Sequence, residues 1–152
     1  MPFELHTYRT QPHDGRGAAP SYGHEAAAAL DLSPDRVFKT LLARVDERLV
    51  VAVVPVSARL DLKALAAAAG GKRAAMADPA DAERATGYVV GGISPVGSRT
   101  RLRTVIDETV RDEPVVYVSA GRRGLQVSLA PDELVRVTGA TVAPIRRPGP
   151  DG

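Results

Sequence analysis

An almost unbroken run of apolar residues at 49–56 constrains the fold of this chain more than any other stretch. Strands that read as continuous apolar β-formers are typical of the centre of a sheet that is covered on both faces. Pro55 cannot donate a ladder hydrogen bond, so it indicates that this strand ends near a sheet edge or a bulge. We therefore expect a sheet with other elements packed on both of its faces.

The segment before this run, residues 37–45, alternates as a strand does and carries one unusual side chain. Lys39 is the only charge on a face that is otherwise apolar. A lysine directed into an apolar interior is costly unless an anion pairs with it, which makes Lys39 a site candidate. Near the start of a strand, its long side chain can equally reach water, as most lysines do. Both interpretations stay open on these grounds.

Two glycine-rich loops each follow an expected strand. The first lies in GYVVGGISPVG at residues 87–97, and the second lies in AGRRG at residues 120–124. A loop of this kind can aim backbone N–H groups at an anion or a carbonyl oxygen, although an ordinary hairpin turn is the simpler interpretation. Together with Lys39 the loops supply donors and a positive charge, but no evident general base.

The remaining pattern adds short strands and helices. Further strands are expected at 3–8, 115–119, 125–129 and 141–145, with an arginine-rich strand or loop at 98–106. Short helices are expected at 25–30, 62–69, 78–84 and 131–137, with single helical turns after Ser33 and at 107–111. The chain thus predicts one α+β domain over residues 1–145, built on a mixed sheet of about seven strands. Residues 146–152 are expected to form a disordered tail.

The sequence argues against several common kinds of catalytic site. It has no cysteine, which removes disulfides, thiolate metal sites and cysteine nucleophiles. Its three histidines, His6, His13 and His24, lack the spacing of metal ligands. Neither glycine-rich loop matches a serine nucleophile elbow, a nucleotide-triphosphate loop or a dinucleotide fingerprint. We therefore expect neither a metal ion nor a cofactor.

Charge and hydropathy set weaker limits. The net charge of +2 is too small to indicate nucleic-acid binding by composition. Cationic residues nevertheless cluster at 72–73, 99–103 and 122–123, either as a solvated surface or as a face that contacts phosphates. No apolar run approaches the ~20 residues of a membrane-spanning helix, and no signal peptide is visible, so we expect a cytoplasmic protein.

Six segments, taken together and in order, resemble one known family. They are HTY at 6–8, VFKTLL at 37–42, LDLKALA at 60–66, ATGYVVGGISPVG at 85–97, TVID at 104–107 and YVSAGRRGLQVSLAPDEL at 117–134. Their order and spacing are similar to those of the YbaK/EbsC proteins, Cys-tRNA(Pro) deacylases related to the editing domain of bacterial prolyl-tRNA synthetases. The resemblance spans nearly the whole chain and implies a curved, mostly antiparallel mixed sheet with short flanking helices.

The resemblance implies a free-standing proofreading enzyme. Prolyl-tRNA synthetase mischarges tRNA(Pro) with cysteine, because its pocket cannot fully reject an amino acid of similar size, and the family cleaves that ester. In the implied mechanism the cysteine thiol attacks its own ester carbonyl and leaves as a thiolactone. The implied partners are the acceptor end of mischarged tRNA(Pro) and, transiently, the synthetase. A deacylase for another small amino acid such as alanine, and a non-catalytic tRNA- or synthetase-binding module, are the alternatives.

The resemblance also implies the site residues. Lys39 matches the family's lysine, which would hold the phosphate of the terminal adenosine or position the ester. The implied substrate-binding residues are Tyr8, Thr40, Gly91, Gly92, Ile93, Ser94, Pro95, Ser119 and Gly121. The chain departs from the family pattern in two places. It begins at its first expected strand, where the family usually has a helix, and Gln126 stands where some members carry an aspartate.

Overall fold

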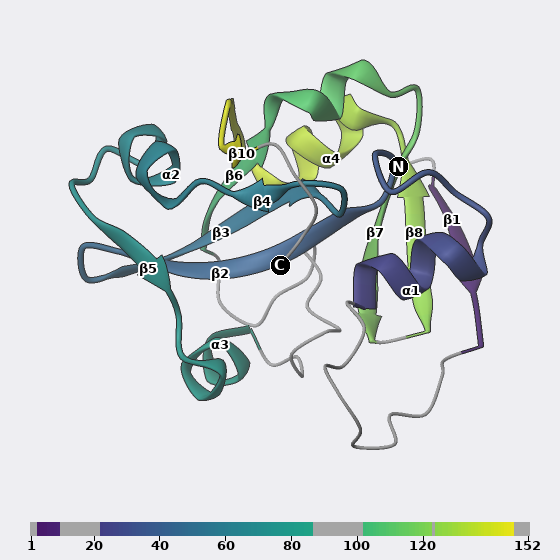
Figure 1. Cartoon of the computed structure of the whole chain (residues 1–152), viewed down its shortest axis with the longest axis horizontal. Helices are drawn as coiled ribbons and strands as arrows, with labels where there is room; N and C mark the ends of the chain where they lie inside the picture. The colour runs from purple at the N-terminus through teal and green to yellow at the C-terminus, as the bar shows by residue number, and fades with distance from the viewer. Residues whose placement is uncertain (1–2, 10–21, 87–101, 123, 148–152) are drawn as a thin grey trace.

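The structure is a computed structural model that describes residues 3–9, 22–86, 102–122 and 124–147 (Figure 1). Its helices are α1 (Tyr22–Ala29), α2 (Leu62–Ala68), α3 (Pro79–Thr86), the 3-10 helix η1 (Glu108–Asp112) and α4 (Pro131–Thr138). Its strands are β1 (Phe3–Thr7), β2 (Phe38–Val45), β3 (Arg48–Pro55), β4 (Arg59–Leu60), β5 (Ala74–Met76), β6 (Arg103–Asp107), β7 (Val116–Arg122), β8 (Leu125–Leu129), β9 (Thr141–Ala143) and β10 (Arg146–Arg147).

The largest sheet is centred on the apolar run that opens the sequence argument. Its strand order is β5-β2-β3-β6-β9, with β3 antiparallel to β2 and parallel to β6. Every residue from Val50 to Val56 is buried, which confirms the prediction of a central strand covered on both faces. Pro55 is the last residue of β3, opposite Phe38, so it ends the ladder without interrupting it.

Two smaller sheets complete the described fold. β1, β8 and β7 form an antiparallel sheet in that order, and β4 pairs with β10. The α+β class with mixed strands and short flanking helices is confirmed. The described residues form ten strands in three hydrogen-bonded sheets, more than the seven expected. The extra strands β4, β5 and β10 have the sequences RL, AAM and RR, which carry no run of β-formers.

The described chain extends past the expected end of the domain. Arg146–Arg147 (β10) pair with β4, although we expected a disordered tail from residue 146. The backbone N–H of Arg146 donates to the Asp107 carboxylate at 3.1 Å, which fixes this segment to the core. Residues 148–152 lie outside the described residues.

The helical turn expected after Ser33 is present as a hydrogen-bonded turn, in which the Arg36 N–H donates to the Ser33 carbonyl at 3.0 Å.

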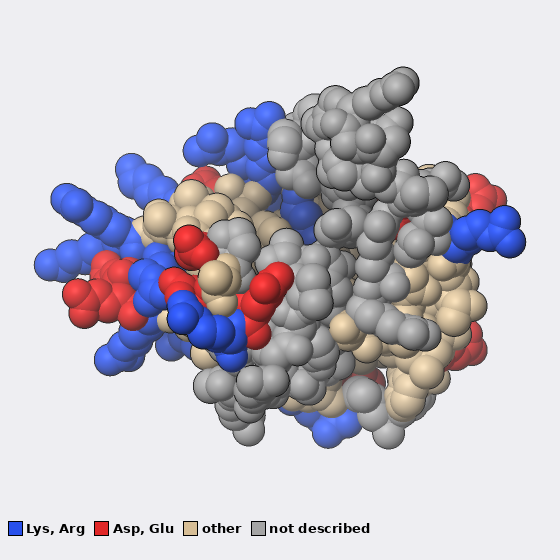
Figure 2. Space-filling view, turned by 90° about the horizontal axis from the view of Figure 1, so that it is seen from below, with Lys and Arg blue, Asp and Glu red and all other residues tan. Residues whose placement is uncertain are grey.

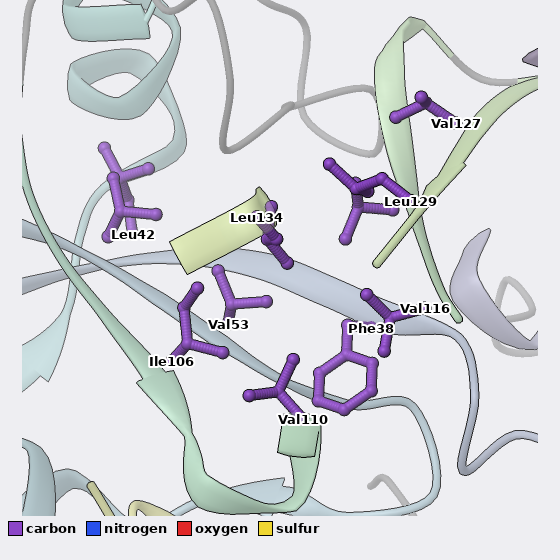
Figure 3. Packing of buried hydrophobic residues seen from close by; sticks show 11 residues of the cluster. Phe38, Leu42, Val53, Ile106, Val110, Val116, Val127, Leu129 and Leu134 are labelled. Carbon is purple, nitrogen blue, oxygen red and sulfur yellow. The ribbon is translucent and has the colours of Figure 1, made fainter. Parts of the chain in front are cut away.

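Apolar clusters cover both faces of the five-stranded sheet. The first lies between this sheet and the three-stranded sheet, where Figure 3 shows Leu134 of α4 and Val110 of η1 near Phe38 and Ile106. The second lies on the opposite face, where Leu65 of α2 packs against residues of β2 and β3. Helix α2 therefore covers one face of the sheet, while α4 and η1 cover the other.

A fully buried carboxylate, Asp107 at the end of β6, joins three segments. One of its oxygens accepts hydrogen bonds from the N–H of Thr109 at 3.1 Å and from the Thr109 hydroxyl at 2.5 Å, which caps η1. The other oxygen accepts from the N–H groups of Ile145 at 2.9 Å and Arg146 at 3.1 Å. The acid of the TVID segment therefore has a structural role.

The β2–β3 turn is fixed to the loop between α2 and β5. Asp46 in this turn has a φ of 54°, and its carboxylate accepts from the N–H groups of Lys72 at 3.2 Å and Arg73 at 3.1 Å. Its own N–H donates to the Arg73 carbonyl at 2.8 Å. Gly71 lies where the two segments meet, and a Cβ there would collide with Val45 Cγ1 and lie 3.0 Å from Asp46 Oδ2.

Gly71→Ala should therefore lower the free energy of unfolding by about 1–3 kcal/mol, because the buried Val45 cannot move aside without disturbing β2. Gly70→Asn is the control, since no atom lies within 4 Å of a Cβ at Gly70 and Asn tolerates its φ of 76°. Urea unfolding of both variants measures the difference. An unfolding free energy unchanged by Gly71→Ala would contradict the close approach of the two segments.

Candidate active site

Strands β2 and β7 come together at one point, and this places two predicted site residues on one side. Val37 and Tyr117 form a parallel bridge, and the Tyr117 N–H donates to the Arg36 carbonyl at 3.0 Å. Lys39 and Ser119 each lie two residues farther along their strands. Because side chains alternate along a strand, Lys39 lies on the side of Val37, and Ser119 lies on the side of Tyr117. Two stretches that are distant in sequence therefore converge here.

The same side of the three-stranded sheet carries a row of polar residues. His6 on β1 and Ser119 on β7 are both register partners of Gln126 on β8, so all three share a face. The His6 imidazole Nε2 lies 2.8 Å from the Ser128 hydroxyl, and its ring centroid lies 5.2 Å from that of Tyr117. The opposite face of this sheet is apolar and forms part of the first cluster.

Helix α1 packs over this polar face (Figure 1). Ala26 and Ala27 of α1 are buried against Val37, with Tyr8 and Tyr117 partly buried beside them. The Tyr8 N–H donates to the Gly124 carbonyl at 3.0 Å, so Tyr8 lies where the β7–β8 hairpin turns. The predicted residue Tyr8 thus lies at the same end of the fold as the second glycine-rich loop.

Gly121 interrupts the β7–β8 ladder. The register shifts between Ser119 and Arg122, and Gly121 has a φ of 110°, in a region that favours glycine. The Ser119 hydroxyl accepts a hydrogen bond from the Gly121 N–H at 3.3 Å. Ser119 therefore stabilises the irregular backbone of this loop.

The neighbouring residues Lys39 and Thr40 lie on opposite sides of β2. Lys39 is half-buried between Val37, which packs under α1, and Leu41, which packs under α2. Thr40 lies on the side of Phe38, toward the first cluster, and its buried hydroxyl has no hydrogen-bond partner. The structure therefore does not bring the Thr40 side chain to the side of Lys39.

Gln126 is a functional candidate that the sequence argument noted only as a departure. The residue is 5% exposed, and its amide oxygen is buried without a hydrogen-bond partner. A buried polar atom without a partner is costly, so it is expected mainly where a ligand or water supplies the missing bond. The only sequence signal for it is a glutamine that alternates with buried valine and leucine along β8.

The predicted loop residues Gly91, Gly92, Ile93, Ser94 and Pro95 lie outside the described residues, so their part in the site stays a prediction.

The described ranges hold no group of three His, Asp or Glu side chains that could bind a metal ion. In the same ranges no helix has both the length and the apolarity to cross a membrane.

The fold and the motifs of this chain are those of a known protein family. The chain matches the aminoacyl-tRNA editing domain over residues 18–137, which is most of its length, so it belongs to that family. Within it the chain is a member of the YbaK/EbsC group of aminoacyl-tRNA deacylases, as the six sequence segments predicted. In Enterococcus faecalis (strain ATCC 700802 / V583), a protein named as a proposed Cys-tRNA(Pro)/Cys-tRNA(Cys) deacylase, EbsC, is 39% identical over 120 residues, covering 78% of this chain and 73% of EbsC.

Solved structures agree with this assignment. A hypothetical protein, APE2540, is 28% identical with a TM-score of 0.83, and the match covers 97% of this chain and 93% of that one. A protein described as a candidate trans-editing enzyme for prolyl-tRNA synthetase is 27% identical with a TM-score of 0.80, covering 95% and 87%. These similarities confirm the YbaK-like fold expected from the sequence.

Proposed function

We propose that this chain removes cysteine from mischarged tRNA(Pro) in trans and leaves tRNA(Pro) with a free terminal hydroxyl. The observation that carries the proposal is the placement of Lys39 and Ser119 on one side of β2 and β7. This arrangement offers a cation and a shaped backbone, while the chain has no cysteine to act as a nucleophile. The name of the relative EbsC supports the choice of cysteine. Because a charged tRNA is the substrate, we place the reaction in the cytoplasm.

The proposed chemistry uses the nucleophile of the substrate. The cysteine thiol loses its proton, and its sulfur attacks the ester carbonyl carbon. The bond from that carbon to the ribose oxygen breaks, the ribose oxygen takes up a proton, and cysteine leaves as a thiolactone. Lys39 would either stabilise negative charge on the carbonyl oxygen or hold the phosphate of the terminal adenosine, and each role requires its positive charge.

A deacylation panel tests the proposal. Purified protein is incubated with tRNA(Pro) charged with cysteine, alanine or proline, and ester loss is compared with loss in buffer. We expect fast loss of cysteine alone, because alanine and proline have no thiol. Loss of alanine at a similar rate would favour a deacylase for small amino acids. If no ester is lost faster than in buffer while tRNA still binds, the chain is a binding module and the proposal fails.

The proposal includes a transient complex with prolyl-tRNA synthetase, which would deliver the mischarged tRNA. Its support is the printed description of the structural relative as a trans-editing enzyme for that synthetase. A pull-down at low and high salt measures it. Failure to recover the synthetase even at low salt, with charged tRNA present, would count against this part.

Gln126→Met should separate a substrate contact from a structural one. If the amide oxygen accepts a hydrogen bond from bound substrate, we expect kcat/KM to fall about tenfold, while the unfolding free energy is unchanged or rises by up to about 1 kcal/mol. Ser128→Ala is the control, because its hydroxyl already has a partner in His6, and this variant should lose about 1 kcal/mol of stability. Gln126→Met with lowered stability and full activity would assign Gln126 to the fold.

A further inference from the structure

Four exposed cationic residues from three separate segments gather at the end of the fold opposite to Lys39. We call this group the basic end: Arg48 on β3, Lys72 and Arg73 between α2 and β5, and Arg103 on β6. Figure 2 shows Lys and Arg side chains projecting from the end of the molecule that carries the β2–β3 turn. Arg48 and Arg103 also line a surface hollow of about 1050 Å³ there, together with Arg44, Asp46 and Glu47.

The basic end is preorganised by the fold. The Asp46 carboxylate accepts hydrogen bonds from the backbone N–H groups of Lys72 and Arg73 at 3.2 and 3.1 Å, so it holds their loop in place. The Arg103 guanidinium donates to the Ala68 carbonyl at 3.4 Å, at the last residue of α2. The loop is thus held by backbone contacts, while the Lys72 and Arg73 side chains are exposed to solvent.

Two members of the basic end, Arg48 and Arg103, lie on the same face of the five-stranded sheet as Lys39. Arg103 is the register partner of Val50, which packs under α2, and Arg48 precedes Val50 by two residues. Lys39 precedes Leu41, which also packs under α2, by two residues. Arg48 is the register partner of Val45, six residues from Lys39 along β2, a separation of about 20 Å. Lys39 and the basic end therefore lie at opposite ends of the part of this face that α2 covers, close enough for one large molecule to contact both.

We propose that the basic end binds phosphates of the tRNA backbone, away from the ester. This inference rests on the proposed function, in which the tRNA terminus binds at Lys39. The rest of the tRNA, a polyanion, then needs a second binding surface. A group of exposed lysine and arginine side chains suits phosphates, whose contacts contribute much of the affinity of proteins for nucleic acids. A chain with a net charge of only +2 has little general attraction for RNA, so local concentration of cations is the main route to affinity.

The test compares a whole tRNA with its terminal fragment. The double variant Lys72→Gln/Arg73→Gln is assayed on Cys-tRNA(Pro) and on the cysteine ester of the terminal CCA trinucleotide. On the whole tRNA we expect kcat/KM to fall roughly tenfold, mostly through KM, and its salt dependence to weaken by about one power of salt concentration for each lost contact. On the trinucleotide we expect no change.

The control Arg111→Gln/Arg136→Gln removes the same charge from η1 and α4, which cover the opposite face of the sheet, and should behave as wild type. Anisotropy binding of uncharged tRNA(Pro) makes the test independent of catalysis, and we expect the basic-end variant alone to bind more weakly. Wild-type behaviour of the basic-end variant on tRNA, or an equal loss on the trinucleotide, would overturn the inference. So would unchanged tRNA binding with lost recovery of the synthetase, since that would assign the surface to a protein. If the wild type cleaves neither ester, the proposed function fails, and the binding arm still decides this inference.

Discussion

Lys39→Ala should slow the deacylation of Cys-tRNA(Pro) by roughly 10²–10³-fold, the range expected when one preorganised group that stabilises developing charge is removed. Lys39 is half-buried where the cluster under α1 meets the cluster under α2, on the side of β2 that continues toward Ser119 through the Val37–Tyr117 bridge. Single-turnover kinetics measure the loss. A thermal melt measures whether the variant keeps its fold. We expect that it does, because the neighbours of residue 39 on β2 stay packed.

Two further variants identify what Lys39 contributes. Lys63→Ala removes an exposed lysine from α2 and should leave the rate unchanged. Lys39→Arg keeps the charge but replaces a compact ammonium by a planar guanidinium, so we expect a partial loss. Full activity of Lys39→Ala would return Lys39 to the alternative that the sequence left open, a strand lysine whose head reaches water.

Asp107→Ala should lower the free energy of unfolding by about 3–5 kcal/mol, because the buried carboxylate accepts four hydrogen bonds that no other group would replace. The substitution leaves the N–H groups of Thr109, Ile145 and Arg146 without their acceptor, and the Arg146 guanidinium without its carboxylate at 3.6 Å. Domains of this kind are stable by about 5–15 kcal/mol, so the variant is expected near the limit of folding. Denaturant unfolding measures the change.

Asp132→Ala is the control, because the Asp132 side chain is 87% exposed and its pair with Arg111 is at the surface. We expect it to change the unfolding free energy by less than about 1 kcal/mol. If Asp107→Ala folds, its activity per folded molecule should equal that of wild type, because Asp107 stabilises the fold and is not part of the candidate active site. An activity lost with the stability unchanged would contradict the structural role.

The central strand could be predicted from the sequence, whereas the short strands could not. Residues 49–56 are eight successive apolar residues, most of them β-formers, so the sequence predicts a strand that is buried on both faces. Strands β4 and β10 have two residues each, and their pairing depends on the Asp107 carboxylate that fixes Arg146. Such ladders are set by tertiary contacts, which no local pattern encodes.

The residues of the candidate site could be proposed from the sequence, but their spatial arrangement could not. The alternation of residues 37–45 identified Lys39, and the family motifs identified Ser119 and Gly121. Their convergence depends on one isolated bridge between β2 and β7, which involves residues 80 positions apart in the sequence (117 minus 37). The partnerless oxygen of Gln126 could not be predicted, because it depends on the position of β8 between β1 and β7 in the folded sheet.

The most direct test of the proposed function uses one batch of Cys-tRNA(Pro), half of it alkylated at the cysteine thiol before the enzyme is added. We predict that the untreated ester is lost much faster than in buffer, and that the alkylated ester is lost no faster than in buffer. Equal loss of both esters would contradict the substrate-assisted route, because the protein would then supply the nucleophile. Stability of both esters would contradict the deacylation of Cys-tRNA(Pro) itself.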